Sequence, residues 1–209
     1  AYGPALNSVG IAQACRQMGH RVVFICDPGF RGVFAEYGFE EFEVNLSKPM
    51  PPEQTANYWS DFIEQQIPNF HKSAYHQIDN YVKDCWEAIV DTAKWAQKGL
   101  PDILNAIQPD LICVDNVILF PAIKQFGVPW VRIVSCSENE VADDNIAPYL
   151  SGCREEDVVG REQFRRRYKE VLKPIHDEFN QFLVDCGEKP YELANFVEES
   201  PFMNFLLYP

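Results

Sequence analysis

The sequence predicts an α/β fold in which a parallel sheet has helices on both faces, with one helical insertion. Short apolar runs that are typical of buried strands alternate with segments in which apolar residues recur every three or four positions, as on one face of a helix. The apolar runs are continuous, which favours interior strands of a parallel sheet. The chain has 209 residues, of which 46% are hydrophobic, so we expect one domain spanning residues 1–209.

The first elements lie before residue 50. An opening turn leads into a helix whose apolar residues recur at helical spacing between residues 11 and 18, and Gly19 is its expected end. Residues 21–26 form the first predicted strand. A second helical stripe occupies residues 30–37, and residues 39–44 form the next strand.

A long helical region, residues 57–98, forms the predicted insertion, after which strands and helices alternate again. These later elements are a helix at residues 103–107, a strand at 111–115, a helix at 120–126, a strand at 130–134 and a helix at 162–186. We expect the strands at residues 21–26, 111–115 and 130–134 to be interior strands. Such an arrangement is Rossmann-like.

Composition and charge exclude several classes of function. A formal net charge of -13 is unfavourable for binding the phosphate backbone, so no nucleic-acid partner is expected. The seven cysteines are widely spaced and odd in number, which favours buried reduced thiols and a reducing, cytoplasmic setting. Their spacing indicates no metal site. No apolar run approaches the roughly 18 residues that a membrane span requires, so no span is expected.

Residues 3–30 resemble the opening turn, first helix and following strand of the UDP-glycosyltransferases of the GT-B fold. Four later segments look like further parts of that family's N-terminal, acceptor-binding domain, in order: Gln-Pro-Asp-Leu-Ile-Cys-Val-Asp (108–115), Val-Pro-Trp-Val-Arg-Ile-Val-Ser (128–135), Ala-Pro-Tyr-Leu-Ser-Gly (147–152) and Glu-Ser-Pro-Phe-Met-Asn-Phe-Leu-Leu-Tyr-Pro (199–209). Nothing in the sequence matches the signature of the family's donor-binding domain. Because an apolar strand comes first in that family, we expect native residues ahead of Ala1.

The resemblance also implies where the chemistry takes place. In that family a histidine of the opening loop, paired with an aspartate, removes the proton of the acceptor hydroxyl. The family's spacing puts Pro4 at the histidine position, and proline has no basic side chain. Asp115 matches the paired aspartate, at the carboxyl edge of the predicted sheet, where ligands bind in open α/β folds. The alternative role for Asp115 is to cap the turn that follows its strand.

The resemblance further places an acceptor cleft between the carboxyl edge of the sheet and the helical insertion. Small-molecule sites are mainly apolar with a few polar groups. We expect the residues in contact with the ligand to be Trp59, Phe62, Phe120, Ser135, Cys136, Ser137 and Asn139. The expected ligand is therefore a small, largely apolar molecule.

These observations leave three interpretations of the function. The favoured one is a glycosyltransferase-like domain that does not transfer a sugar by itself and binds or carries a small hydrophobic molecule, with a homo-oligomer as a possible replacement for the contact with a donor domain. The second is the N-terminal half of a two-domain UDP-glycosyltransferase. In that case the UDP-sugar would belong to the second domain, and this chain is expected to hold no cofactor. The third is a structural or storage role.

Overall fold

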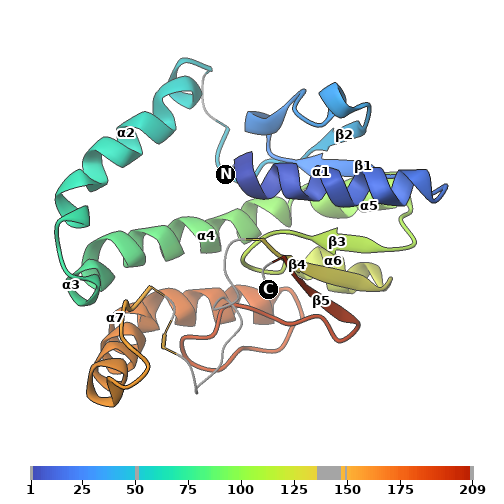
Figure 1. Ribbon diagram of the computed structural model, residues 1–209. Coiled ribbons are helices and arrows are strands. Elements are labelled where there is room, and N and C mark those ends of the chain that lie inside the picture. Colours follow the sequence, from blue (N-terminus) through green and yellow to red (C-terminus); the bar gives the residue numbers. More distant parts are fainter. Residues whose placement is uncertain (1, 50–51, 136–146, 149, 208–209) are drawn as a thin grey trace. The chain divides into compact units, whose positions relative to one another are not determined.

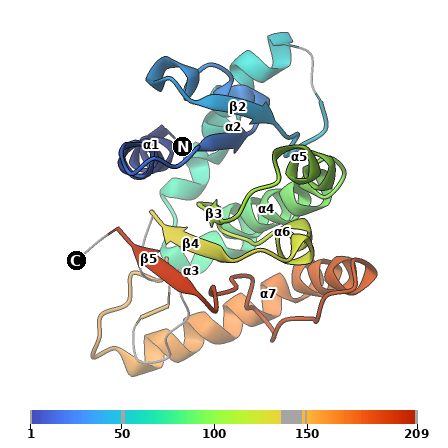
Figure 2. The ribbon, with the colours of Figure 1, turned by 90° about the vertical axis from the view of Figure 1, so that its right-hand side faces the viewer.

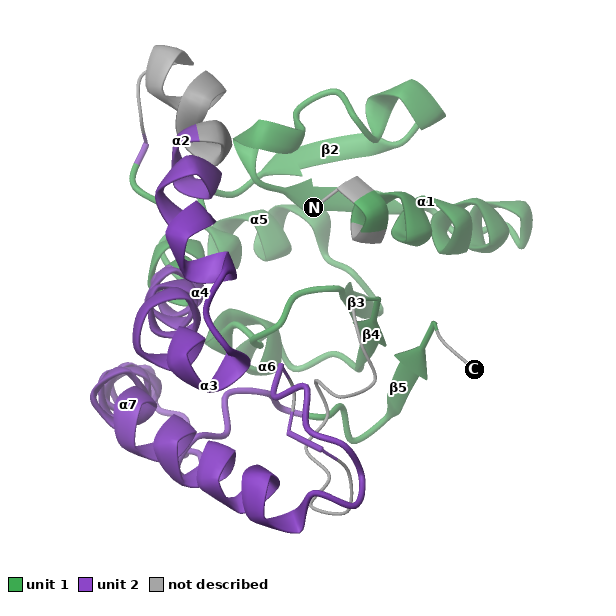
Figure 3. Cartoon of the chain, turned by 60° about the vertical axis from the view of Figure 1, so that its left-hand side comes forward, with its two compact units in different colours: residues 1–48, 92–138, 199–209 green, residues 49–91, 139–198 purple. Residues whose placement is uncertain are grey.

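The computed structural model describes residues 2–49, 52–135, 147–148 and 150–207, and of residues 2, 4 and 52–60 it describes the backbone alone. The fold is mixed α/β, as the sequence predicts. By its contacts the chain divides into two compact units (Figure 3). The first unit comprises residues 1–48, 92–138 and 199–209, and the second comprises residues 49–91 and 139–198.

The first unit contains two small parallel sheets (Figure 1). In one sheet β1 (Val23–Cys26) pairs with β2 (Glu40–Glu43). The other sheet consists of β3 (Ile112–Val114), β4 (Trp130–Val134) and β5 (Met203–Leu206), with β4 in the middle. The strands are short, and β1, β3, β4 and β5 are mostly apolar, as expected for a sheet that helices cover, whereas three of the four residues of β2 are glutamates.

The pairing of the strands differs in part from the prediction. β4 is an interior strand, as expected. Among the strands that the structure describes, however, β1 pairs only with β2 and β3 pairs only with β4. The expectation that residues 21–26 and 111–115 form interior strands therefore does not hold for the described chain. β1 and β3 each have one edge without hydrogen bonds to another described strand, so the described strands form two sheets instead of one.

Helices lie on both faces of these strands (Figure 2). α1 (Tyr2–Gln17) lies on one face, and α5 (Leu100–Ile107) and α6 (Pro121–Phe126) lie on the other. α6 ends at Gly127, whose φ of 84° is a left-handed conformation that glycine adopts without strain. The alternation of helix and strand thus gives the layered arrangement that the sequence predicts.

α1 packs on the β1–β2 sheet through a small apolar core. Val9 and Ala12 of α1 are buried together with Cys26, Phe34 and Phe39. The ring of Phe24 on β1 stacks on that of Phe34 with their centroids 4.0 Å apart. Burial and, to a lesser extent, the nearby acidic side chains together raise the pKa of the Cys26 thiol to about 11, so this thiol stays protonated.

Residues 28–37 depart from the predicted helix. They form two separate 3-10 turns, Pro28–Phe30 and Ala35–Tyr37, and the second ends at Gly38 with a φ of 77°. Backbone N–H groups of this segment bond to the side chain of Glu41 rather than to helix carbonyls. A side-chain acceptor therefore replaces the intrahelical bonds of a longer helix.

The second unit is helical. Its elements are α2 (Pro52–Phe70), α3 (Ala74–Gln77), the π-helical turn Ile78–Val82, the first part of α4 (Lys83–Ala96) and α7 (Val158–Asp185). Ile78, Val82, Trp86 and Val90 are buried at a spacing of four residues, which confirms the helical stripe in this part of the insertion.

Aromatic rings form the core of the second unit. Trp86 of α4 stacks on Phe196 with their centroids 4.2 Å apart, and Phe179 of α7 packs against Phe196 at 5.9 Å. His176 of α7 is buried beside Phe196, and burial lowers the pKa of its imidazole. None of the helices described here has the length and apolar composition needed to cross a bilayer.

Candidate functional site

The candidate site lies at the carboxyl edge of the three-stranded sheet. Asp115 directly follows β3, and Ser135 directly follows β4. Because β3 and β4 are parallel, their carboxyl ends meet at one edge, with Val114 paired to Arg132. The segment predicted to be a strand up to residue 115 thus ends one residue earlier, and Asp115 is the first residue beyond it.

Three elements meet at the Asp115 carboxylate. Ser8 Oγ of α1 donates a hydrogen bond to Oδ2 at 3.0 Å, and Ser135 Oγ donates to Oδ1 at 2.6 Å. Each carboxylate oxygen is therefore fixed by a hydroxyl from another part of the first unit, 107 and 20 residues away in sequence. We call Ser8, Asp115 and Ser135 the Asp115 cluster.

The environment of Asp115 opposes its ionisation. Burial raises the pKa of this carboxyl above its ordinary value, and the two serine hydroxyls and the charge of Arg132 lower it only in part. Such a group can accept a hydrogen bond when ionised and can hold a proton more readily than an exposed aspartate. Perturbed carboxyls at a sheet edge occur at functional sites, although structural clusters also perturb pKa values.

Arg132 of β4 supports the loop that begins with Asp115. Its side chain is 1% exposed, and its NH1 group donates to the carbonyl oxygens of Asn116 at 2.8 Å and Val117 at 3.3 Å. A buried guanidinium is costly unless it is well bonded. The sequence contains one signal for this role, a charged residue inside the apolar run of residues 130–134, but the sequence alone does not show what it contacts.

Ser8 is a second residue that sequence reasoning missed. α1 already begins at Tyr2, so residues 3–10 are helical and do not form the opening turn that the sequence predicts. Pro4 lies in the first turn of this helix, and Ser8 follows it by four residues, so both lie on one side of α1. The hydroxyl bonded to Asp115 therefore comes one turn after the position that the resemblance assigns to the histidine.

Of the other predicted site residues, the structure describes the side chains of Phe120 and Phe62. Phe120 is 8% exposed in the first unit and directly precedes α6, which is typical of a core residue. Phe62 is half-buried on α2 in the second unit. The predicted contacts that fall outside the described residues or side chains are Trp59, Cys136, Ser137 and Asn139.

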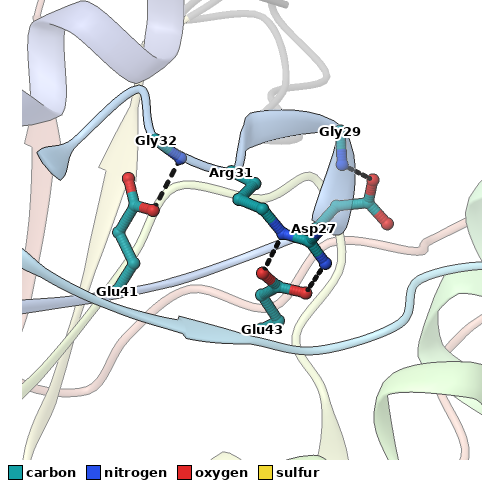
Figure 4. A network of polar contacts seen from close by, with 6 residues as sticks. All are labelled: Asp27, Gly29, Arg31, Gly32, Glu41 and Glu43. Carbon is teal, nitrogen blue, oxygen red and sulfur yellow. Dashed lines mark hydrogen bonds and ion pairs between the residues drawn. The ribbon is translucent and has the colours of Figure 1, made fainter. Parts of the chain in front are cut away.

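A second polar cluster connects the loop after β1 with β2 (Figure 4). The carboxylate of Glu41 on β2 accepts hydrogen bonds from the backbone N–H groups of Gly32 at 2.7 Å, which the figure shows, and of Phe34 at 2.6 Å and Ala35 at 2.9 Å. Burial opposes ionisation of Glu41, but these three donors outweigh it, and the pKa of the carboxyl is lowered. Arg31 forms a two-pronged ion pair with Glu43, whose second bond measures 2.6 Å.

We call this second group the Glu41 cluster; it consists of Asp27, Gly29, Arg31, Gly32, Glu41 and Glu43. Its contacts stabilise the loop between β1 and β2. Asp27 accepts a hydrogen bond from the N–H of Gly29 at 2.9 Å and thereby caps the first turn of the same loop. Backbone donors occupy the Glu41 carboxylate, and Arg31 covers Glu43. A structural role accounts for all of these contacts.

The second unit has an open hollow of about 360 Å³ lined by Lys72, His76, Asp79 and Asn80. Asp79 forms an ion pair with Arg167 of α7, and Ser73 Oγ lies 2.7 Å from Nδ1 of His76. Lys72 Nζ also donates to Asn69 Oδ1 at 2.8 Å, so three of the four lining residues already interact with neighbouring side chains. Among the described residues, no three His, Cys, Asp or Glu side chains are grouped as a metal ion would require.

Comparison with protein-family models finds no match to this chain, and comparison with curated protein sequences finds none either. The assignment of function therefore depends on the Asp115 cluster and on the resemblance of the sequence segments.

Proposed function

We propose that this chain is a glycosyltransferase-like, acceptor-binding domain that holds a small, largely apolar molecule with a hydroxyl group at Asp115 and does not transfer a sugar by itself. The observation that carries the proposal is the Asp115 carboxylate, half-buried at the carboxyl edge of β3 and held there by Ser8 and Ser135. A carboxylate in this environment is a strong acceptor for the hydroxyl of a bound ligand.

The chemistry of the cluster supports binding rather than transfer. Removing the proton of an acceptor hydroxyl requires a base within hydrogen-bond reach, and the partners of Asp115 in the described chain are serine hydroxyls. A serine hydroxyl is not a general base, and Pro4 has no titratable group. Asp115 would therefore orient the ligand through a hydrogen bond.

The second candidate function is the N-terminal half of a two-domain UDP-glycosyltransferase. The same residue favours it, because Asp115 matches the aspartate of the family's catalytic pair. In that case a donor domain would bring the UDP-sugar, and Asp115 would act on the acceptor hydroxyl.

The test compares two matched probes, 1-naphthol and 1-methoxynaphthalene, of which only the first has a hydroxyl donor. We expect the chain to bind 1-naphthol more tightly, and Asp115→Asn to weaken that binding by up to about tenfold while leaving 1-methoxynaphthalene unchanged. Asp110→Asn is the control, because Asp110 is an exposed aspartate of the same unit. Equal affinities of both probes for the unmodified chain and for Asp115→Asn would contradict the proposal.

An activity assay separates the two candidate functions. The chain is expected to transfer no glucose from UDP-glucose to 1-naphthol, and Pro4→His is expected to leave this unchanged because a donor site is still required. Transfer above background by the purified chain would overturn the non-catalytic assignment and favour the second function.

A further inference from the structure

The buried arginine beside the Asp115 cluster has no role in the function proposed above. Arg132 is 1% exposed, in the middle of the interior strand β4, where apolar residues are expected. An arginine keeps its charge at all ordinary pH values, so burying it there carries a free-energy cost. Hydrogen bonds from its guanidinium to backbone carbonyls offset part of that cost.

Two hydrogen bonds of Arg132 go to the segment that carries Asp115. Its NH1 group donates to the carbonyls of Asn116 and Val117, the two residues directly after Asp115. The strand register pairs Arg132 with Val114, the residue directly before Asp115. The arginine therefore contacts or pairs with the chain on both sides of the aspartate.

The residue that directly follows β4 also holds Asp115. Ser135, three residues after Arg132, donates to Oδ1 of Asp115 at 2.6 Å. The charge of Arg132 is one of the influences that favour the ionised form of this carboxyl. α1 contributes the uncharged hydroxyl of Ser8. β4 thus supplies a positive charge that acts on Asp115, and the residue directly after β4 supplies a hydrogen bond.

We propose that Arg132 is a positioning residue of the Asp115 cluster: its guanidinium fixes the backbone directly after Asp115 and adds a positive charge to the surroundings of the carboxylate. This inference rests on the proposed function for its consequence in ligand binding. Its two physical parts, the backbone clamp and the charge, can be measured without any ligand.

Two substitutions separate the two parts. Arg132→Gln removes the charge, whereas Arg132→Lys keeps the charge but replaces the planar fork by a single ammonium group. Arg21→Gln is the control, because Arg21 is an exposed cation of the same unit, paired with Glu40. The first measurement is the pKa of Asp115 by NMR titration of its carboxyl carbon, and the second is hydrogen exchange of the amides at residues 116–118.

We expect Arg132→Gln to raise the pKa of Asp115, because a favourable charge is lost. Arg132→Lys keeps a positive charge at this position and is expected to raise the pKa less than Arg132→Gln does. Both variants are expected to speed amide exchange at residues 116–118 by about tenfold or more. Arg21→Gln is expected to change neither quantity.

Binding of 1-naphthol then links the residue to the function. Binding of 1-naphthol should weaken below a certain pH, and Arg132→Gln should raise that pH because it raises the pKa of Asp115. In a variant that also carries Asp115→Asn, Arg132→Gln should cause no such shift. If Arg132→Gln fails to fold, Arg132→Lys serves as the test. Faster amide exchange at residues 116–118, with the pKa of Asp115 unchanged, would support the role of Arg132 in fixing the backbone after Asp115. An unchanged pKa in folded Arg132→Gln, or unchanged exchange in both variants, overturns the proposal. Lack of 1-naphthol binding overturns the proposed function but leaves these two ligand-free measurements as the test of Arg132.

Discussion

Two carboxylates of the first unit are each held by several hydrogen bonds, yet their environments act on them in opposite directions. Backbone N–H groups of three residues bond to Glu41, and the pKa of its carboxyl is lowered. Serine hydroxyls bond to Asp115, and burial raises the pKa of its carboxyl. The difference comes from the balance between desolvation and the donors that face each group.

This difference separates a structural carboxylate from a candidate functional one. Glu41 is stabilised as an anion, and its carboxylate accepts the backbone hydrogen bonds that hold the loop of residues 28–37. Asp115 is held in place at a free-energy cost to its ionised form, an arrangement that is found at functional sites as well as in structural clusters. Number of hydrogen bonds alone therefore does not identify a site, whereas the direction of the pKa shift helps to do so.

The largest expected effect comes from removing the aromatic support of the Glu41 cluster. Phe34 is 5% exposed, its ring stacks on Phe24, and its N–H donates to Glu41. Phe34→Ala is expected to lower the free energy of unfolding by about 3 kcal/mol, measured by urea denaturation, because it leaves a cavity in the core. Tyr37→Ala, at a partly exposed position of the same loop, is the control.

The same variant tests whether the two clusters are independent. The pKa of Asp115 is expected to stay unchanged in Phe34→Ala, because Ser8 and Ser135, which bond to Asp115, do not belong to the Glu41 cluster. A shift of the Asp115 pKa would show that the two carboxylates are coupled and would weaken the contrast between them.

The sequence predicts the Asp115 site in part because strands have a strong local signal. The run at residues 130–134 matches β4 at both ends, and the end of β3 places Asp115 at the sheet edge. Ser8 and Arg132 act through contacts over 107 and 16 residues of sequence, which periodicity does not report. The choice between turn and helix at residues 3–10 also depends on such contacts.

The loop of residues 28–37 shows the same limit in the fold. Its apolar residues are spaced as on a helix, so the sequence predicts one. In the structure Glu41, a residue of the next strand, takes the N–H groups of Phe34 and Ala35, and two 3-10 turns form. A side chain several residues away decides the backbone conformation here, and helical spacing carries no information about it.

The second prediction removes the charge of the structural carboxylate. Glu41→Gln is expected to lower the free energy of unfolding by roughly 1 kcal/mol at pH 7, a value reduced for the partial exposure of the group. The folded-state pKa of Glu41 lies below its ordinary value of 4.5, so its stabilisation is present above pH 4.5 and is lost as the pH falls through the folded-state pKa. Urea denaturation at pH 7 and at progressively lower pH measures this.

The control is Glu36→Gln, which removes an exposed carboxylate from the same loop. It should change stability little at either pH. A loss of stability in Glu41→Gln that persists unchanged in acid would mean that the shape of the side chain, rather than its charge, holds the loop.

The third prediction has the opposite sign. Asp115→Asn is expected to raise the free energy of unfolding at pH 7 by less than about 1 kcal/mol, because asparagine removes a poorly solvated charge and can still bond to both serines. The folded-state pKa of Asp115 lies above its ordinary value of 3.8, so the stability that Asp115 contributes is full below pH 3.8 and is lost as the pH rises through the folded-state pKa. The advantage of the variant should therefore disappear in acid.

Urea denaturation of Asp115→Asn and of the control Asp110→Asn over the same pH range provides the measurement. Together with weaker 1-naphthol binding, a stabilising effect would show a residue retained for function at a cost in stability. A clear loss of stability in Asp115→Asn at pH 7 would instead support the turn-capping role.

The smallest effect is expected for the ion pair between Arg31 and Glu43. Its geometry is favourable, since the guanidinium bonds to both carboxylate oxygens, which raises the pKa of Arg31 and lowers that of Glu43. Both side chains nevertheless remain in contact with water, at 69% and 37% exposure, where screening and side-chain entropy offset most of the attraction.

A double-mutant cycle of Arg31→Gln and Glu43→Gln, measured by urea denaturation at about 50 mM and 500 mM salt, should give a coupling near the limit of detection that fades at the higher salt. A coupling that exceeded the effect of Glu41→Gln and persisted at high salt would show that the loop depends on its exposed ion pair. The backbone bonds to Glu41 would then not be the main contacts that hold the loop.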